Sequence, residues 1–377
     1  MEPVLQYKTD IMKDGKIIAA ITQGDINGIS YEVMLKTFED NRMTEFCTPL
    51  IYGSSKIWGF YRNLLKIENI NLNLLTSAND ARSKCVNFLN VLSDNASAEV
   101  GHNTQTAGDA SLKALQAAVK DIRDKKVDIL VTAPINKNNI RIPDKKFIGH
   151  TEYLAEAFGT ENYLMLMVSD NLKVGFVTGH IPLQDVSKSI SKNLILKKLE
   201  VLNESLKKDF LIVKPRIAVL GLNPHCGDNN LIGNEESEII SPAIKEAQEK
   251  NILAFGPYSA DGFLGAETIK NFDAVLAMYH DQGMIAFKSR SFDTGVNYTA
   301  GLPFVRTSPA HGTAYEIAGL GQAKPDSFRA ALYLACDIFK NRKHYAEITA
   351  NPLKYKNNSH SRDNNHRDDP TIISADN

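Results

Sequence analysis

The stretch LKALQAAVKDIRDKKVDILVTA (112–133) holds a helix pattern followed directly by the pattern of a buried strand. Apolar side chains recur in its first part at a spacing that places them on one face of a helix, namely at Leu112, Leu115, Val119 and Ile122. Its second part, 127–133, is a continuous apolar run, which is typical of a strand buried on both faces of a parallel sheet. The stretch therefore predicts one helix–strand unit of an α/β protein.

The same alternation continues along most of the chain. Further strand-like runs lie at 16–22, 163–168, 173–178, 216–220 and 273–278. A second helical pattern is formed by Ile195, Leu199, Leu202 and Leu206. The alternation predicts an α/β fold with a largely parallel sheet. Because neither an internal repeat nor a Pro- or Gly-rich linker interrupts it, residues 1–350 are expected to form a single catalytic unit.

Composition narrows the class of protein. The 377 residues are 43% hydrophobic and 23% charged, with 43 basic and 44 acidic side chains and a net charge of -1. This balance argues against a global electrostatic grip on nucleic acid or on an anionic membrane. No apolar run approaches the length of roughly 18 residues that a membrane span needs, and the N-terminus lacks the apolar core of a signal peptide. Four scattered cysteines show no pairing pattern, so we expect a cytoplasmic protein.

The C-terminal segment, 354–377, has a different character. It is polar and nearly free of apolar anchors. Such a segment cannot bury enough surface to offset its ordering entropy. We therefore expect a disordered tail.

Three histidines follow three of the predicted strands. His180, His225 and His280 each come after an apolar run and lie beside glycine or proline. Three neutral imidazoles that leave positions open are a known arrangement for catalytic Zn²⁺ and similar ions, provided that the three strands are neighbours. Purely structural histidines are the alternative, because neither an HExxH nor a paired CxxC motif is present to fix a metal by spacing.

A second group of residues is suited to anions. His150 and Thr151 precede a helical pattern, and Thr151 is expected to cap that helix, whose N–H groups would attract phosphate or carboxylate. Lys288, Asn297 and Arg306 lie in the strand-rich segment 287–309. Lys137 follows the strand at 127–133. Arginine and lysine can hold phosphate or carboxylate, but a surface ion pair is the simpler interpretation of each alone.

A third segment is rich in glycine. His311, Gly312, Thr313 and Ala314 are followed by IAGLGQAKP (317–325). Glycine permits close backbone approach to a ligand as well as tight turns. The segment lacks the GxGxxG pattern and does not directly follow a strand, so a classical Rossmann nucleotide site is not supported. An ordinary loop is the alternative.

Eight segments carry a family resemblance: ITQGDINGI (21–29), VTAPINK (131–137), GHTEYLAE (149–156), TGHIPL (178–183), GLNPHCGD (221–228), AMYHDQGM (277–284), GVNYTAGLPFVRTSPAHGTA (295–314) and IAGLGQAKPDSF (317–328). In order and spacing they resemble the 4-hydroxythreonine-4-phosphate dehydrogenase family of vitamin B6 biosynthesis. The HGTA portion also resembles the cofactor loop of isocitrate and isopropylmalate dehydrogenases. The resemblance therefore implies the fold of isocitrate and isopropylmalate dehydrogenases. In this fold two interleaved α/β subdomains surround a largely parallel sheet, and the active-site cleft lies between the two subdomains.

The resemblance also implies roles for individual residues. His180, His225 and His280 correspond to the ligands of a divalent metal ion, drawn from both subunits of a homodimer, and with Lys288 they are the expected catalytic residues. The expected substrate contacts are His150, Thr151, Lys288, Asn297 and Arg306. The expected contacts of NAD or NADP are His311, Gly312, Thr313 and Ala314. The metal is Zn²⁺, Mg²⁺, Mn²⁺ or Co²⁺.

The implied reaction is the metal-dependent, NAD(P)-dependent oxidation of 4-phosphooxy-L-threonine to 2-amino-3-oxo-4-phosphooxybutanoate. This product then decarboxylates to 3-amino-2-oxopropyl phosphate. The same chemistry on threonate or erythronate 4-phosphate is the first alternative, because relatives of that kind share most of the motifs. A metal-dependent hydrolase and a non-catalytic binding protein are the others.

Two segments depart from the family pattern. The first loop reads QGDINGIS where relatives commonly have PGDPAGIGPE, so its shape is open. The segment ADGFLG (260–265) differs from the usual ADTLF-like text but keeps Asp261.

Overall fold

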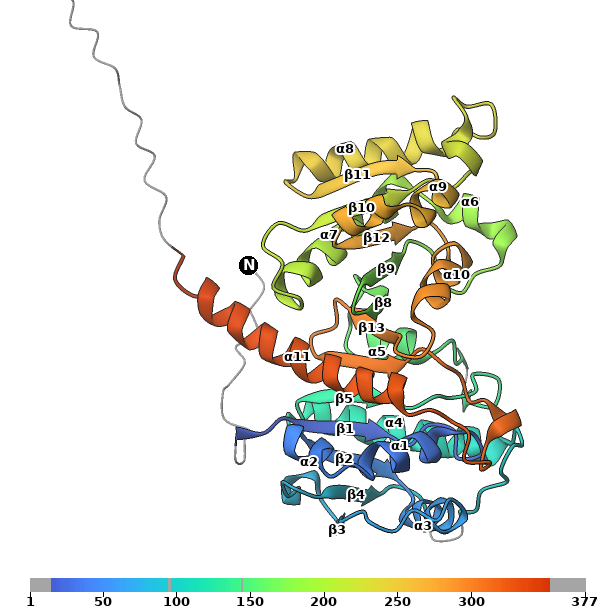
Figure 1. Cartoon of the computed structure of the whole chain (residues 1–377), viewed down its shortest axis with the longest axis vertical. Coiled ribbons are helices and arrows are strands. Elements are labelled where there is room, and N and C mark those ends of the chain that lie inside the picture. The colour runs from blue at the N-terminus through green and yellow to red at the C-terminus, as the bar shows by residue number, and fades with distance from the viewer. Residues whose placement is uncertain (1–14, 94–95, 144, 353–377) are drawn as a thin grey trace, which may run out of the picture.

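Twelve strands form one sheet through the part of the chain that the computed structural model describes, residues 15–93, 96–143 and 145–352 (Figure 1). In sheet order they are β11 (Leu253–Tyr258), β10 (Arg216–Leu220), β12 (Ala274–Ala277), β9 (Leu172–Phe176), β8 (Leu164–Ser169), β13 (Val296–Ala300), β14 (Val305–Pro309), β5 (Ile129–Thr132), β1 (Ile18–Thr22), β2 (Thr48–Gly53), β4 (Val86–Asn90) and β3 (Leu72–Leu75). The predicted C-terminal tail, 354–377, lies outside the described residues.

Strand direction divides this sheet into two parallel halves. Strands β11, β10, β12 and β9 run parallel to one another and form the upper half in Figure 1. Strands β14, β5, β1, β2, β4 and β3 are also mutually parallel and form the lower half. Between the halves, β8 and β13 make three successive antiparallel pairings. The predicted α/β class and largely parallel sheet are confirmed.

The chain builds the lower half first and returns to it at the end. After β5 it crosses to β8 and the upper half, and then comes back through β13 to β14, which pairs with β5. The lower half thus contains strands from distant parts of the sequence, whereas the strands of the upper half are consecutive. The expected division into two subdomains with a cleft between them stays a prediction.

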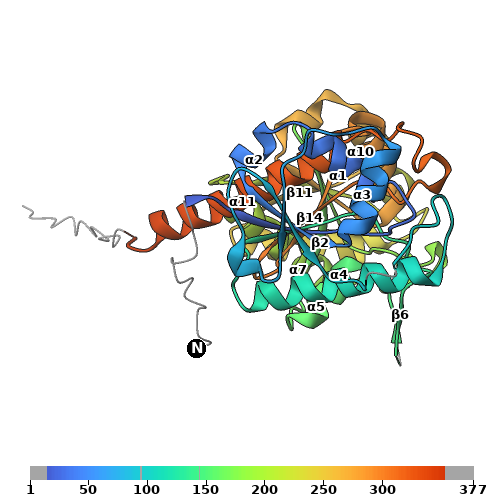
Figure 2. The same cartoon turned by 90° about the horizontal axis from the view of Figure 1, so that it is seen from below.

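Helices cover both faces of the sheet (Figure 2). They are α1 (Ser30–Phe38), α2 (Arg42–Phe46), α3 (Ser55–Leu64), α4 (Gln105–Arg123), α5 (His150–Ala157), α6 (Val186–Ser189), α7 (Lys192–Lys208), α8 (Ser241–Glu249), α9 (Ala260–Gly265), α10 (His280–Ser291) and α11 (Asp326–Thr349). A short hairpin, β6 (Arg141–Ile142) and β7 (Lys145–Lys146), projects from the body. In the described residues no helix is both long and apolar enough to cross a membrane.

Local sequence explains where two of the predicted helices begin. Thr104 caps α4 by accepting a hydrogen bond from the Ala107 N–H, and Ser191 caps α7 in the same way. The periodic apolar residues of both helices are buried or partly buried against the sheet. In β1, alternate side chains point to opposite faces: Ala19 and Ile21 pack in the core on the α1 and α11 side, while Ile18 and Ala20 pack toward α4 and α5.

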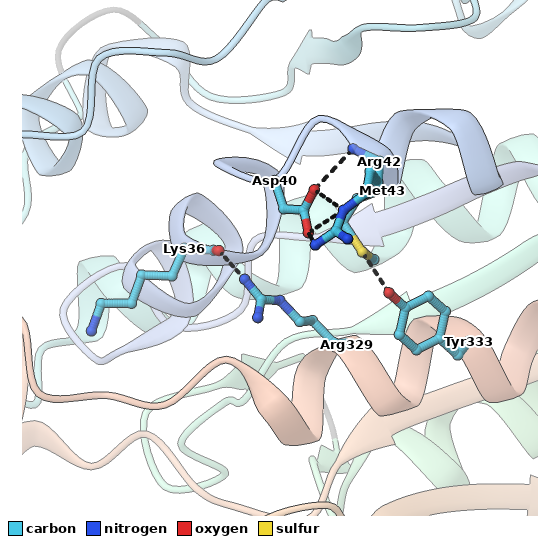
Figure 3. Close-up of polar contacts among 6 residues, drawn as sticks. All are labelled: Lys36, Asp40, Arg42, Met43, Arg329 and Tyr333. Carbon is cyan, nitrogen blue, oxygen red and sulfur yellow. Dashed lines mark hydrogen bonds and ion pairs between the residues drawn. The ribbon is translucent and has the colours of Figure 1, made fainter.

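Helix α11 connects the lower half to the centre of the sheet. At one end, Arg329 donates a hydrogen bond to the Lys36 carbonyl and Tyr333 contacts Met43 (Figure 3). Further along, Arg342 donates to Asp209 at 2.6 Å and to the hydroxyl of Tyr298, which itself bonds Asp209. Asp209 follows α7 and Tyr298 lies on β13, so one buried ion pair joins α7, α11 and the sheet.

We expect Asp209→Ala to lower the free energy of unfolding by about 3 kcal/mol or more, because it leaves the buried guanidinium of Arg342 without its carboxylate. Urea unfolding followed by circular dichroism measures the change. Asp40→Ala is the matched control, since it removes an exposed ion pair with Arg42 (Figure 3). Equal effects of the two substitutions would contradict the structural role of the buried pair.

Candidate active site

Four neighbouring parallel strands each lead into a polar side chain. In sheet order, β11, β10, β12 and β9 are followed by Asp261, His225, His280 and His180. The carboxyl ends of neighbouring parallel strands lie at the same edge of a sheet, where α/β proteins place their sites. The condition set by the sequence, that the three histidine-bearing strands are neighbours, is therefore met.

His180 and His280 lie side by side. Their ring centroids are 5.0 Å apart, and His280 also stacks on Phe176. The Nδ1 of His280 is 2.7 Å from a carboxylate oxygen of Asp281, which orients the ring. Burial, followed by the charges of Lys137 and His280, lowers the pKa of His180. Neutral imidazole is the form that binds a metal ion.

His225 lies apart from this pair. It is exposed in the turn Pro224–Gly227. A hydrogen bond from Ser259 is the main cause of the lowered pKa of Asp261, and the charge of His225 adds a small contribution, so His225 is near Asp261. Within the described residues of one chain, no three His, Cys, Asp or Glu side chains are placed to hold a metal ion together. The structure of a single chain thus brings together two of the three histidines.

A second cluster of polar side chains, here called the Arg306 cluster, lies where α5 begins. The helix starts at His150 with Gly149 as its cap residue, so the expectation that Thr151 caps it is wrong. Thr151 lies inside the first turn, and its hydroxyl is 3.3 Å from that of Thr299 on β13. Because Gly149 has no side chain, the Lys137 side chain can lie against it: a Cβ there would be 3.3 Å from the Lys137 ammonium.

Arg306 is the buried cation of this cluster. Its guanidinium is only 2% exposed, and it donates to the hydroxyls of Thr132 at 2.6 and 3.2 Å and of Thr299 at 3.1 Å. Burial lowers the pKa of Arg306 to about 10, although the charge of Glu152 acts in the opposite direction. A buried cation held by neutral hydroxyls is ready to bind an anion.

Two neighbours of Arg306, His150 and Lys137, also have lowered pKa values. Burial, and then the charges of Arg306 and Lys137, lower the pKa of His150 well below its usual value, so this ring is neutral at pH 7. Burial also lowers the pKa of Lys137. The charge of Lys137 acts on both His150 and His180, so Lys137 lies within electrostatic reach of both rings.

Lys288 and Asn297 occupy other positions. Lys288 is exposed in the last turn of α10, eight residues beyond His280, and its charge reaches His311. Asn297 lies on β13 two residues before Thr299. The oxygen of its side-chain amide, Oδ1, is buried without a hydrogen-bond partner among the described residues. An unpartnered buried acceptor at this position is available to a ligand.

The segment from His311 to Ala314 docks on the first loop. The Thr313 carbonyl accepts a hydrogen bond from the Ile29 N–H at 3.0 Å, and no side chain would fit at Gly28. Tyr315 donates to Asp25 at 2.7 Å. His311 has a buried Nε2 without a hydrogen-bond partner among the described residues.

The unusual first loop is held by the side chains that replace the family pattern. Asn27 bonds the Glu99 N–H, the His102 carbonyl and the Thr104 hydroxyl. Gln23 bonds the Ala110 carbonyl and the Tyr31 hydroxyl. Gln23, Asp25, Asn27 and Tyr31 are fully buried. The loop therefore has a single well-supported shape.

Comparison with known proteins agrees with this arrangement. The sequence pattern of the family described as "Pyridoxal phosphate biosynthetic protein PdxA" matches residues 45–335. The chain is 48% identical to a 4-hydroxythreonine-4-phosphate dehydrogenase of Bacteroides thetaiotaomicron, over 91% of this chain and 94% of that protein. This chain belongs to the PdxA family. A second such dehydrogenase, of a Sulfurihydrogenibium strain, is 42% identical over 86% of this chain and 99% of that protein.

Solved structures of the PdxA family show the same fold. The crystal structure of a 4-hydroxythreonine-4-phosphate dehydrogenase from Klebsiella pneumoniae matches with a TM-score of 0.74 and 32% identity. The match covers 86% of this chain and 99% of that one. The similarity thus extends across both halves of the sheet.

The sequence does not identify three of the residues that act on Arg306, namely Thr132, Thr299 and Glu152. The hydroxyls of Thr132 and Thr299 accept hydrogen bonds from the Arg306 guanidinium, and the charge of Glu152 raises the pKa of Arg306 against the effect of burial. Strand register is the signal that would have found them. Arg306 pairs with Leu130 on β5, two residues before Thr132, and Thr299 follows directly on the Tyr298–Thr307 pair of β13 and β14.

We expect Arg306→Met to weaken the binding of inorganic phosphate by about 10- to 100-fold, because the anion would lose its charged hydrogen bonds to the guanidinium. Wild-type affinity should also fall as the pH rises through about 10, where Arg306 loses its proton and its charge. Isothermal titration calorimetry measures both effects. Arg42→Met, at an exposed arginine, is the control. Unchanged phosphate affinity in Arg306→Met would rule out Arg306 and its neighbours as an anion site.

Proposed function

We propose that this chain is a metal-dependent NAD(P) dehydrogenase that oxidises 4-phosphooxy-L-threonine to 2-amino-3-oxo-4-phosphooxybutanoate. Loss of CO₂ then gives 3-amino-2-oxopropyl phosphate, in the biosynthesis of pyridoxal 5′-phosphate. The observation that carries the proposal is the buried Arg306, bonded to threonine hydroxyls, together with Lys137, whose charge acts on the histidine pair. The names of the three relatives above support the same substrate, and none of the three is named for a sugar acid.

The substrate has an anionic group at each end, and the structure offers cations in two places. We propose that Arg306, Thr151 and Lys137 bind one anionic group. Lys288 binds the other, because it lies eight residues beyond His280 on α10, about 12 Å along the helix. His150, whose lowered pKa keeps it neutral, then serves as a hydrogen-bonding partner rather than as a third cation. The substrate carbon chain would lie between these two groups of cations, beside His180 and His280.

The histidines fit a divalent metal ion. His180, His280 and His225 would hold it, and imidazole ligands suit Zn²⁺ and other transition ions. A metal ion bound there polarises the substrate hydroxyl and lowers its pKa. Asp281 keeps the Nδ1 side of His280 engaged, so the other ring nitrogen is the one available to the metal.

The cofactor would lie against the loop from His311 to Ala314. A nicotinamide held there would supply the acceptor for the hydride of the substrate carbon. The support within this chain is the buried, unpartnered Nε2 of His311 and the firm docking of Thr313 on the first loop. Burial keeps the pKa of His311 low, so the ring is neutral and presents no repelling charge to the cationic nicotinamide.

We propose a homodimer that completes the metal site with ligands from both subunits. His225 is exposed and apart from the histidine pair within one chain. Large apolar side chains close in sequence to the three histidines are also exposed, namely Ile181, Leu183, Leu231, Ile232, Ile285 and Phe292. Exposed apolar side chains near an incomplete site are typical of a surface that another chain covers.

The purified protein, supplied with Zn²⁺ or Mn²⁺ and NAD⁺ or NADP⁺, should produce reduced cofactor from 4-phosphooxy-L-threonine. Absorbance at the NADH band measures the rate, and threonate and erythronate 4-phosphate are the comparison substrates. Faster oxidation of either sugar-acid phosphate would overturn the proposed substrate. Release of phosphate without cofactor would favour a hydrolase instead.

Mixing two inactive variants tests the shared metal site. His180→Ala and His225→Ala homodimers, unfolded and refolded together, should regain about a quarter of wild-type activity, because half of the dimers are mixed and each then holds one intact site. His180→Ala mixed with His280→Ala should regain nothing, since these rings lie together in one chain. Recovery in both mixtures, or in neither, contradicts the proposed division of ligands.

A further inference from the structure

The loop that carries His225 has a costly backbone. From His225 to Asn230, all six residues have positive φ, between 42° and 79°, and only Gly227 is a glycine. Side-chain-bearing residues adopt this left-handed conformation rarely. Such strained backbone persists at functional sites only where the surrounding structure enforces it. Something must therefore hold this loop.

The carboxylate of Glu236 lies inside the loop. One of its oxygens accepts hydrogen bonds from the Leu222 and Asn223 N–H groups, both at 2.7 Å. Its other oxygen accepts from the Asn223 side-chain amide at 3.0 Å. These bonds fix the backbone just before His225.

The same carboxylate also touches the far side of the turn. A Cβ at Gly227 would lie 3.0 Å from one Glu236 oxygen, and a Cβ at Gly221 would lie 3.1 Å from the other. The glycines thus let the loop close around Glu236, which is only 4% exposed. Glu236 begins a π-helical turn, Glu236–Ile240, that leads directly into α8, so the carboxylate is attached to a rigid element.

We propose that Glu236 is a positioning residue that holds the backbone of the 221–230 loop so that His225 is presented to the metal ion. This inference rests on the proposed role of His225 as a metal ligand. A carboxylate is required because all three groups that face it are N–H donors. A glutamine would turn a fourth N–H group toward them.

Glu235 provides a matched control. It carries the same charge one residue earlier, but it bonds the Ser187 hydroxyl and the outer side of the Asn223 amide rather than the loop backbone. Glu235→Gln and Glu236→Gln therefore change the net charge equally, while only the second removes the carboxylate from the Leu222 and Asn223 N–H groups.

The experiment titrates Zn²⁺ into the metal-free full-length dimer by isothermal titration calorimetry. Loss of a group that orients a ligand typically costs 10- to 100-fold in metal affinity. We expect Glu236→Gln to bind Zn²⁺ about 10- to 100-fold more weakly, with Glu235→Gln within about twofold of wild type. His225→Ala should lose at least as much as Glu236→Gln. Hydrogen exchange at the amides of 221–230 should become faster in Glu236→Gln alone.

Wild-type affinity in Glu236→Gln, with a loss in His225→Ala, would overturn the positioning role and leave the proposed function standing. Wild-type affinity in both variants would remove His225 from the metal site, and the inference with it. Equal losses in the two glutamine variants would assign the effect to net charge and overturn the inference. If Glu236→Gln does not fold, Glu236→Asp, which withdraws the carboxylate by one methylene, is measured under the same criteria.

Discussion

The buried guanidinium of Arg306 is the constraint on which the geometry of the site depends. Removing a charge from water is costly, and among the described residues two threonine hydroxyls offset that cost through hydrogen bonds. Those hydroxyls come from β5 and β13, so the arrangement requires β14 to lie between these two strands. That place is where the sheet changes from parallel to antiparallel pairing. The bonds of Arg306 to Thr132 and Thr299 therefore depend on this change of strand direction.

The same reversal lies between the two groups of candidate site residues. The histidines follow strands of the upper half, whereas Lys137 follows β5 of the lower half. The charge of Lys137 nonetheless lowers the pKa of both His180 and His150. A single unidirectional sheet would place the two groups in a row along one edge. Here three antiparallel pairings reverse the strand direction between the two halves.

Much of this arrangement could be predicted from the sequence, because buried strands are continuous apolar runs and the polar side chains follow directly. The six predicted strands all form, and so do the three predicted helices, α4, α5 and α7. The pairing of Arg306 with Thr132 and Thr299 depends on strand register, which apolar runs alone do not define. Thr151 was misplaced because glycine, without any side-chain cap, begins α5 at His150. The separation of His225 from the other histidines arises from a left-handed loop that composition does not reveal.

The first loop shows why a departure from a family pattern does not by itself indicate a different function. Proline fixes a loop by restricting φ, whereas this chain uses buried side-chain hydrogen bonds from Gln23, Asn27 and Tyr31. Asp25, which the family pattern also has, bonds the Asn139 amide and Tyr315. The loop still supports Thr313 through the Ile29 N–H. The segment from His311 to Ala314 depends on this backbone contact. The substituted residues therefore change how the first loop is held but not its contact with that segment.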